Sequence, residues 1–276
     1  MKSQIGYLCP IQMILTDTHI HLYAEEYEGD RNELITTAID AGVRRFLIPN
    51  IDSTSVAGML GLANSFPGIC LPMLGLHPCY VKENFREELN LIYSYLSDAG
   101  TGAVAIGEIG LDFYWDLTFR EQQEIALKEQ FQWASELNLP VAIHSRNSTD
   151  EVIAILKELK SLNLKGVFHC FSGDMKQAET IIDLGFYLGI GGVVTFKNSG
   201  LDKIIAQLPL SNLLLETDGP YLAPAPFRGK RNEPSYLKLI AAKVSEIKGV
   251  SIEEISEITT ANADRLFGLK RFSNDQ

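Results

Sequence analysis

Cysteine is scarce in this 276-residue sequence, which contains only four of them. They form neither a C-x-x-C pair nor the compact framework that stabilises small secreted domains. The spacing therefore predicts the reduced thiols of an intracellular protein. The four residues are Cys9, Cys70, Cys79 and Cys170.

Long apolar runs are also absent. None approaches the roughly 20 residues that a transmembrane helix needs, so we expect no contact with a membrane. Residues 1–12 carry one lysine and an apolar patch broken by Pro10, without a small-residue cleavage site, which argues against a signal peptide. We expect a cytoplasmic protein with a dispensable leader over 1–12 and a single domain over 13–276.

Positive charge is in short supply. Lysine and arginine number 24 against 35 acidic residues, and the formal net charge is −11. A protein that holds nucleic acid by its overall charge needs an excess of basic side chains for the phosphates, which this sequence lacks. The composition still allows a local basic patch, or metal ions that reverse the charge of one cleft.

The sequence does contain a regular alternation of short apolar runs with longer amphipathic segments, which predict strands and helices respectively. Eight such units in about 250 residues predict a (β/α)8 TIM barrel. A doubly wound open sheet is the alternative, but it usually carries a glycine-rich phosphate loop where this sequence has histidines. The predicted strands are 14–22, 43–50, 70–78, 103–112, 140–146, 165–173, 186–194 and 213–222. The predicted helices are 30–41, 53–65, 84–98, 119–138, 149–162, 174–184, 200–208, 234–248 and 252–267.

The first predicted strand ends in the segment TDTHIHL, which holds two of the five histidines. Alternate residues of a strand share a face, so His19 and His21 would both point into the barrel mouth, with Asp17 below them. Two neutral imidazoles on one face can chelate a divalent metal. Taken alone, the motif is equally compatible with a hydrogen-bonded structural pair.

Further metal-ligand residue types end other predicted strands. Glu108 follows the fourth apolar run, His144 the fifth, His169 the sixth and Asp218 the eighth, and His77 ends the third. Active sites of TIM barrels assemble at the carboxyl ends of the strands, and unpartnered buried carboxylates or imidazoles would be costly. The joint pattern predicts a metal site at this end of the barrel.

These blocks resemble the TatD family of metal-dependent deoxyribonucleases, which belongs to the amidohydrolase-like barrels. The similar segments run in family order from residue 14 to about 234, and a last one covers 259–269. They read TDTHIHL, GLHP, GEIGLDFY, HSR, HCFSG, ETDGPYLAPAPFRGKRNEP and TTANADRLFGL.

The resemblance implies a site for two divalent metal ions. Mixed imidazole and carboxylate ligands suit Zn²⁺ or Mn²⁺, whereas Mg²⁺ prefers oxygen ligands; the pattern leaves all three open. Two ions would activate a shared water and clamp the oxygens of a phosphodiester. The implied ligands are His19, His21 and Asp218 for one ion, His144 and His169 for the other, and Glu108 as the bridge.

Four carboxylates have predicted roles beside the ions. Glu108 and Asp218 are the predicted catalytic residues, because Asp218 has a second oxygen that can accept a proton from the water. Glu216 and Asp17 are expected to orient imidazoles. The alternative for these two is a satisfied buried carboxylate.

Several cationic or polar groups are candidates for substrate phosphate. The loop after the eighth strand holds Arg228, Lys230 and Arg231, and loops at this position of TIM barrels often bind phosphate. Arg146 shares the face of His144 and is a further candidate, as is His77, for which a core role is nearly as well supported.

Other residues near these motifs are given structural roles. Asn232 and Glu233 are expected to anchor the basic loop. The aromatic run 113–115 could stack a base, but packing is the favoured interpretation. Cys170 alternates away from His169, so it is excluded as a ligand.

The leading function is a metal-dependent hydrolase of ester bonds, a deoxyribonuclease that acts on ends or single strands of DNA, with no obligate protein partner. One alternative is a small-molecule amidohydrolase or lactonase with the same metal centre, but the basic loop argues against it. A non-catalytic binding barrel is the other, and the intact ligand set argues against that.

Overall fold

Eight parallel strands form one sheet in the order β1 to β8. The computed structural model describes residues 13–270, so the predicted leader over 1–12 lies outside the described residues. Each strand pairs with the next along the chain, which confirms the barrel and excludes a doubly wound order. The strands are β1 (Leu15–Asp17), β2 (Val43–Pro49), β3 (Cys70–Leu74), β4 (Ala105–Asp112), β5 (Val141–Arg146), β6 (Gly166–Phe168), β7 (Tyr187–Ile190) and β8 (Leu213–Leu215).

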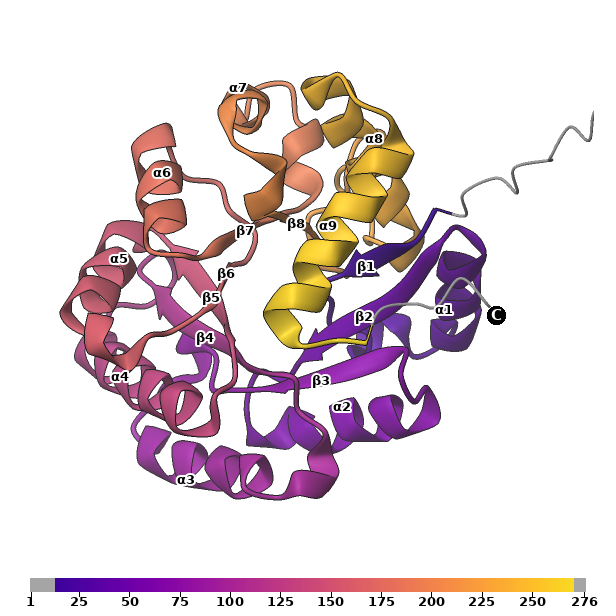
Figure 1. The fold of residues 1–276 in the computed structure, drawn as a ribbon. Coiled ribbons are helices and arrows are strands. Elements are labelled where there is room, and N and C mark those ends of the chain that lie inside the picture. The colour runs from indigo at the N-terminus through magenta and orange to yellow at the C-terminus, as the bar shows by residue number, and fades with distance from the viewer. Residues whose placement is uncertain (1–12, 271–276) are drawn as a thin grey trace, which may run out of the picture.

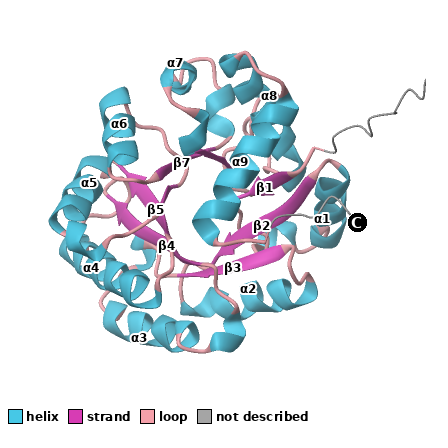
Figure 2. Ribbon diagram, viewed as in Figure 1, coloured by secondary structure: helices cyan, strands magenta, loops and turns pink. Residues whose placement is uncertain are grey.

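The α-helices surround the sheet as an outer layer (Figure 1 and Figure 2). A large apolar cluster fills the space between strands and helices, as expected when amphipathic helices cover a parallel sheet. No helix in residues 13–270 is both long and apolar enough to cross a membrane. The helices are α1 (Arg31–Asp40), α2 (Ser53–Ser65), α3 (Phe85–Leu96), α4 (Arg120–Leu137), α5 (Thr149–Glu158), α6 (Met175–Asp183), α7 (Leu201–Gln207), α8 (Leu237–Lys248) and α9 (Ile252–Phe267).

Helix α9 lies across one end of the barrel (Figure 1). Its residues Ala263, Leu266 and Phe267 belong to a second apolar cluster with inward-facing residues near the starts of several strands, such as Ala105 and Ala142. The amino-terminal end of the barrel is therefore packed with apolar side chains, which leaves the carboxyl-terminal end for a polar site.

All eight strands are shorter than predicted, and β1, β6 and β8 span only three residues each because the chain leaves the ladder soon after entering it. The segment after β1 bonds to the segment around β8 instead: the N–H of Thr18 donates to the carbonyl of Leu215 (3.0 Å), and that of Asp218 donates to the carbonyl of His19 (2.9 Å). These bonds bring the two ends of the sheet together into a nearly closed barrel. They also fix the two segments that carry the histidine pair and Asp218.

Candidate metal centre

Glu108 lies inside β4, where the backbone departs from regular pairing with β5 between Ile106 and Ile109. Glycines on both sides allow β4 to approach β5 closely. A Cβ on Gly107 would lie 2.7 Å from that of Ala142, and a Cβ on Gly110 would lie 1.9 Å from the carbonyl oxygen of His144. Irregularities of this kind re-aim a side chain next to active sites, and here the Glu108 carboxylate is buried at the barrel mouth.

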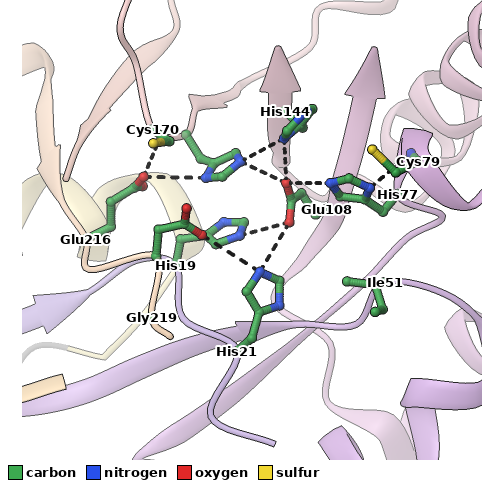
Figure 3. A network of polar contacts seen from close by, with 12 residues as sticks. His19, His21, Ile51, His77, Cys79, Glu108, His144, Cys170, Glu216 and Gly219 are labelled. Atoms are coloured by element: carbon green, nitrogen blue, oxygen red, sulfur yellow. Dashed lines mark hydrogen bonds and ion pairs between the residues drawn. The ribbon is translucent and has the colours of Figure 1, made fainter. Parts of the chain in front are cut away.

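All five histidine rings face this carboxylate, and its two oxygens divide them into two sets (Figure 3). Oε2 is 3.0 Å from Nε2 of His19 and 3.5 Å from Nε2 of His21. Oε1 is 2.8 Å from Nε2 of His169, 2.9 Å from Nδ1 of His144 and 3.2 Å from Nε2 of His77. One carboxylate therefore stands between two clusters of imidazole nitrogens.

Asp218 reaches both sets. Its carboxylate lies within 4.8 Å of ring nitrogens of His19 and His169, and Oδ1 is 3.9 Å from Nε2 of His21. The rings of His19 and His169 stack with their centroids 3.8 Å apart. Asp218 adopts a left-handed backbone conformation with φ of 56°, which aspartate tolerates better than most residues and which is common at functional sites.

Three of the rings also have a partner at the nitrogen that faces away from Glu108. Nε2 of His144 is 2.9 Å from Oδ2 of Asp112, Nδ1 of His21 is 3.3 Å from the Tyr23 hydroxyl, and Nδ1 of His169 is 3.5 Å from Oε1 of Glu216, near enough for an ion pair. Partners of this kind fix the tautomer of metal-ligating histidines.

His77 differs from the other four histidines. Its Nδ1 accepts the N–H of Cys79 at 3.1 Å, so this nitrogen carries no proton. The neutral ring then has its proton on Nε2, which acts only as a donor and in this structure faces Oε1 of Glu108. Burial lowers the pKa of His77, which is consistent with the neutral form. His77 is thus placed as a hydrogen-bond donor at the centre rather than as a ligand.

Burial and mutual charge set the protonation of the centre. Burial lowers the pKa of His19 to about 3 and that of His21 to about 4, so both rings are neutral at pH 7. Burial alone would raise the pKa of Glu108, but His169 and the neighbouring rings hold it well below its usual range. Burial also raises the pKa of Asp218 to about 7. His19 and His21 are therefore in the neutral state that binds a cation, whereas for His169 burial is outweighed by Glu108 and Glu216, which hold its pKa well above the usual value.

The donor set fits a divalent transition metal. Three groups of ligand atoms have their members within 4.8 Å of one another in the described residues. Nδ1 of His19 is buried without a hydrogen-bond partner, so the protein leaves this polar atom unsatisfied. Mixed nitrogen and oxygen donors suit Zn²⁺, Mn²⁺ and similar ions. Two groups consist of predicted ligands alone, namely His19, His169 and Asp218, and His19, His21 and Glu108; the third, His77, Glu108 and His144, includes the ring assigned above as a hydrogen-bond donor.

All six residues predicted as ligands come together in the structure. Cys170, which was excluded as a ligand, belongs to none of the three groups. The sequence analysis missed Asp112, although it stands four residues after Glu108 and therefore on the same strand face. That spacing, together with its place at the end of β4, was the available signal.

The two other carboxylates have different roles. Glu216 lies beside His169 and accepts the N–H of Cys170, as expected for a residue that positions the ring. Asp17 was expected to orient an imidazole, but its carboxylate instead accepts the N–H of His19 (3.3 Å) and both the N–H and the hydroxyl of Thr217. The expectation for Asp17 is therefore wrong: its carboxylate links the segment after β1 to the segment after β8.

The basic loop divides into anchored and free cations. Arg231, predicted with the phosphate contacts, instead forms a two-pronged ion pair with Asp30 at 2.9 and 2.6 Å. Asn232 anchors the loop as predicted, because its buried amide donates to two carbonyls. Arg228 and Lys230 are exposed and form no ion pair with any described carboxylate.

Comparisons with known proteins agree with the site. The model of the family described as TatD related DNase matches residues 16–268. The uncharacterized metal-dependent hydrolase YabD of Bacillus subtilis (strain 168) is 40% identical over 92% of this chain and 99% of its own. The protein named 3'-5' ssDNA/RNA exonuclease TatD of Pantoea vagans (strain C9-1) is 34% identical, over 92% of this chain and 99% of its own.

A solved structure of a TatD homologue has the same fold as this chain. The crystal structure of YjjV, the TatD homologue from Escherichia coli K12, superposes with a TM-score of 0.88 at 32% identity and covers 94% of this chain and 100% of its own. The match to the family model spans nearly the whole described chain and every residue of the metal centre. The chain therefore belongs to the TatD related DNase family.

Proposed function

We propose that the protein is a metal-dependent hydrolase that cleaves phosphodiester bonds of DNA, acting on strand ends or single strands. The observation that carries the proposal is the division of imidazoles around Glu108, in which each carboxylate oxygen faces its own set of ring nitrogens. A bridging carboxylate between two ligand sets is the arrangement expected of a two-ion centre.

In this proposal the rings near Oε2 of Glu108 would hold one ion, and two of the rings near Oε1 would hold the other. Asp218 would complete the first set, which is supported by its carboxylate lying within 4.8 Å of ring nitrogens of His19 and His169. The ions, when bound, supply Lewis-acid activation of water and of the phosphoryl oxygens. The ligands are His19, His21 and Asp218, then His144 and His169, with Glu108 shared.

The chain's own groups then perform the proton transfer. Asp218 has a second carboxylate oxygen that can take the proton of the attacking water. His77 holds its proton on Nε2, toward Glu108, and can donate a hydrogen bond to a phosphate oxygen or to the departing oxygen.

Exposed cations at the same end of the barrel would bind the phosphates of the DNA strand. Arg228, Lys230 and Arg146 are exposed, and none pairs with a carboxylate among the described residues. An arginine suits a phosphate because its guanidinium can donate two parallel hydrogen bonds. The name of the Pantoea vagans relative, a single-strand DNA and RNA exonuclease, supports the substrate class.

The test is digestion of end-labelled DNA by purified protein loaded with Zn²⁺, Mn²⁺ or Mg²⁺. We expect faster loss of label from single strands than from blunt duplex, abolition by EDTA and recovery when the metal is restored. A panel of amides and lactones, run with the same loaded protein, tests the small-molecule alternative. Hydrolysis of that panel without cleavage of any phosphodiester would contradict the proposal.

A further inference from the structure

The segment between β4 and α4, residues 113–119, exposes two large aromatic side chains at the barrel mouth. Trp115 leaves 69% of its surface exposed and Tyr114 leaves 53%, whereas Phe113 packs against the core. The prediction that all three aromatics pack is therefore wrong for two of them. Exposed aromatics beside a candidate active site are typical of a binding surface.

The aromatic pair is tied to the metal centre through one carboxylate. Oδ1 of Asp112 accepts the N–H of Tyr114 at 2.9 Å and that of Trp115 at 3.2 Å. Oδ2 of the same side chain is 2.9 Å from Nε2 of His144. A ligand that rests on Trp115 would therefore lie at a fixed position relative to the ring of His144.

Arg146 adds a positive charge to the same surface. It stands two residues after His144 at the end of β5, and its guanidinium carbon lies 3.9 Å from the ring centre of Tyr114 and 5.2 Å from that of Trp115. It is exposed and forms no ion pair with a described carboxylate. In a chain of net charge −11, an unneutralised arginine beside two exposed aromatic rings, which meet edge to face, favours an anionic, aromatic ligand.

A cavity of about 180 Å³ opens next to Trp115. Its walls include Phe119 and Val81, and its polar lining includes Lys82 and Asp116, which pair with each other at 3.4 Å. An apolar cavity of about 150 Å³ in another protein accepts a benzene ring, so this one is large enough for the ring of a base. Its mixed lining offers both a stacking face and hydrogen-bonding groups.

We propose that Trp115, Tyr114 and Arg146 form a site for one nucleotide of a single-stranded nucleic acid, with the base stacked on Trp115 and a phosphate at Arg146. The inference rests on the proposed function, and it assigns to these three residues the preference for single strands over duplex. Bases of a duplex are paired and stacked on each other, so only an unpaired base can present its face to Trp115.

Kd is measured by the fluorescence anisotropy of an end-labelled strand, which does not depend on Trp115. Contact with Trp115 is detected separately by intrinsic fluorescence, because the chain has two tryptophans and the other, Trp133, is buried in α4. The probes are an oligothymidine with phosphorothioate linkages that resist cleavage, a strand of the same backbone without bases, and the corresponding duplex. The variants are Trp115→Ala, Trp115→Phe and, as a matched control, Tyr95→Ala on the outer helix α3, where Tyr95 is 37% exposed.

The oligothymidine should quench the wild-type emission but not that of Trp115→Phe, in which only Trp133 emits. Trp115→Ala should raise the Kd for this strand about tenfold or more, Trp115→Phe should retain part of the affinity, and Tyr95→Ala should bind like the wild type. The Kd for the strand without bases should be the same in wild type and Trp115→Ala.

The inference is overturned if Trp115→Ala binds the oligothymidine as tightly as the wild type, if it weakens both strands equally, or if the duplex quenches as strongly as the single strand. Failure of the proposed function gives a different result, namely a metal-loaded wild type that cleaves no phosphodiester. The two failures are therefore distinguishable.

Discussion

Replacing Asp112 with asparagine preserves the shape of the side chain but reverses one hydrogen bond. Oδ1 of Asp112 accepts two backbone N–H groups of the following loop, and Oδ2 faces Nε2 of His144. In Asp112→Asn the amide oxygen can keep the backbone bonds only if its NH₂ group faces Nε2. The proton of the ring must then move to Nδ1, the nitrogen that faces Glu108, and the lone pair for a cation is lost.

Loss of a partner that orients a ligating histidine typically costs 10- to 100-fold in metal affinity or activity, which corresponds to about 1.4 to 2.7 kcal/mol. The variant should lose that affinity at one ion only, because the rings at Oε2 of Glu108 do not contact Asp112. Competition with a chromophoric chelator measures the affinity, and kcat/KM for single-stranded DNA measures the consequence.

Asp116→Asn is the matched control for this change. Asp116 lies in the same loop but is exposed, and its contacts go to Lys82 and to the N–H of Thr118. It should bind metal like the wild type. If Asp112→Asn also bound both ions with unchanged affinity, the assignment of His144 as an oriented ligand would be refuted.

Three further predictions follow from the site. Arg228→Ala or Lys230→Ala should raise KM for DNA and reduce the salt slope of binding by about one. Arg231→Ala should instead lower the melting temperature, because it breaks the ion pair with Asp30. Equal effects of the three substitutions on KM would contradict the assignment of Arg231 to loop anchoring and of the other two to phosphate. Burial lowers the pKa of His169, but Glu108 and Glu216 outweigh it and hold the pKa well above the usual value. A cation must displace that proton, so metal affinity should rise with pH and activity should fall in acid; calorimetric titration from pH 6 to 8 checks the sign. Asn232→Ala should destabilise the fold by about 2 kcal/mol in urea unfolding, because it leaves two carbonyls without their donor.

The barrel and the grouping of the candidate ligand residues were predictable because they depend on local patterns. Alternation of apolar runs and helices fixes the order of the strands, and residues at strand ends meet at one end of the barrel. His19 and His21 illustrate both the strength and the limit of this reasoning. The strand ends at Asp17, so they are not strand residues, yet the backbone bonds to β8 still aim both rings at Glu108.

The roles that sequence reasoning missed depend on contacts between segments far apart in the chain. Asp17 and Arg231 carry charges beside functional motifs, but their partners, Thr217 and Asp30, lie some 200 residues away. The donor role of His77 depends on a single backbone N–H. No spacing rule contains that information, because the partner is chosen by the folded backbone.

The number of divalent ions bound per chain tests the central claim most directly. Native mass spectrometry of the metal-loaded wild type should show two ions, and Glu108→Gln should lose at least one while its melting temperature stays near that of the wild type, since the apolar core lies below the centre. Two ions in both proteins, or one at most in the wild type, would contradict a carboxylate bridge between two metal sites.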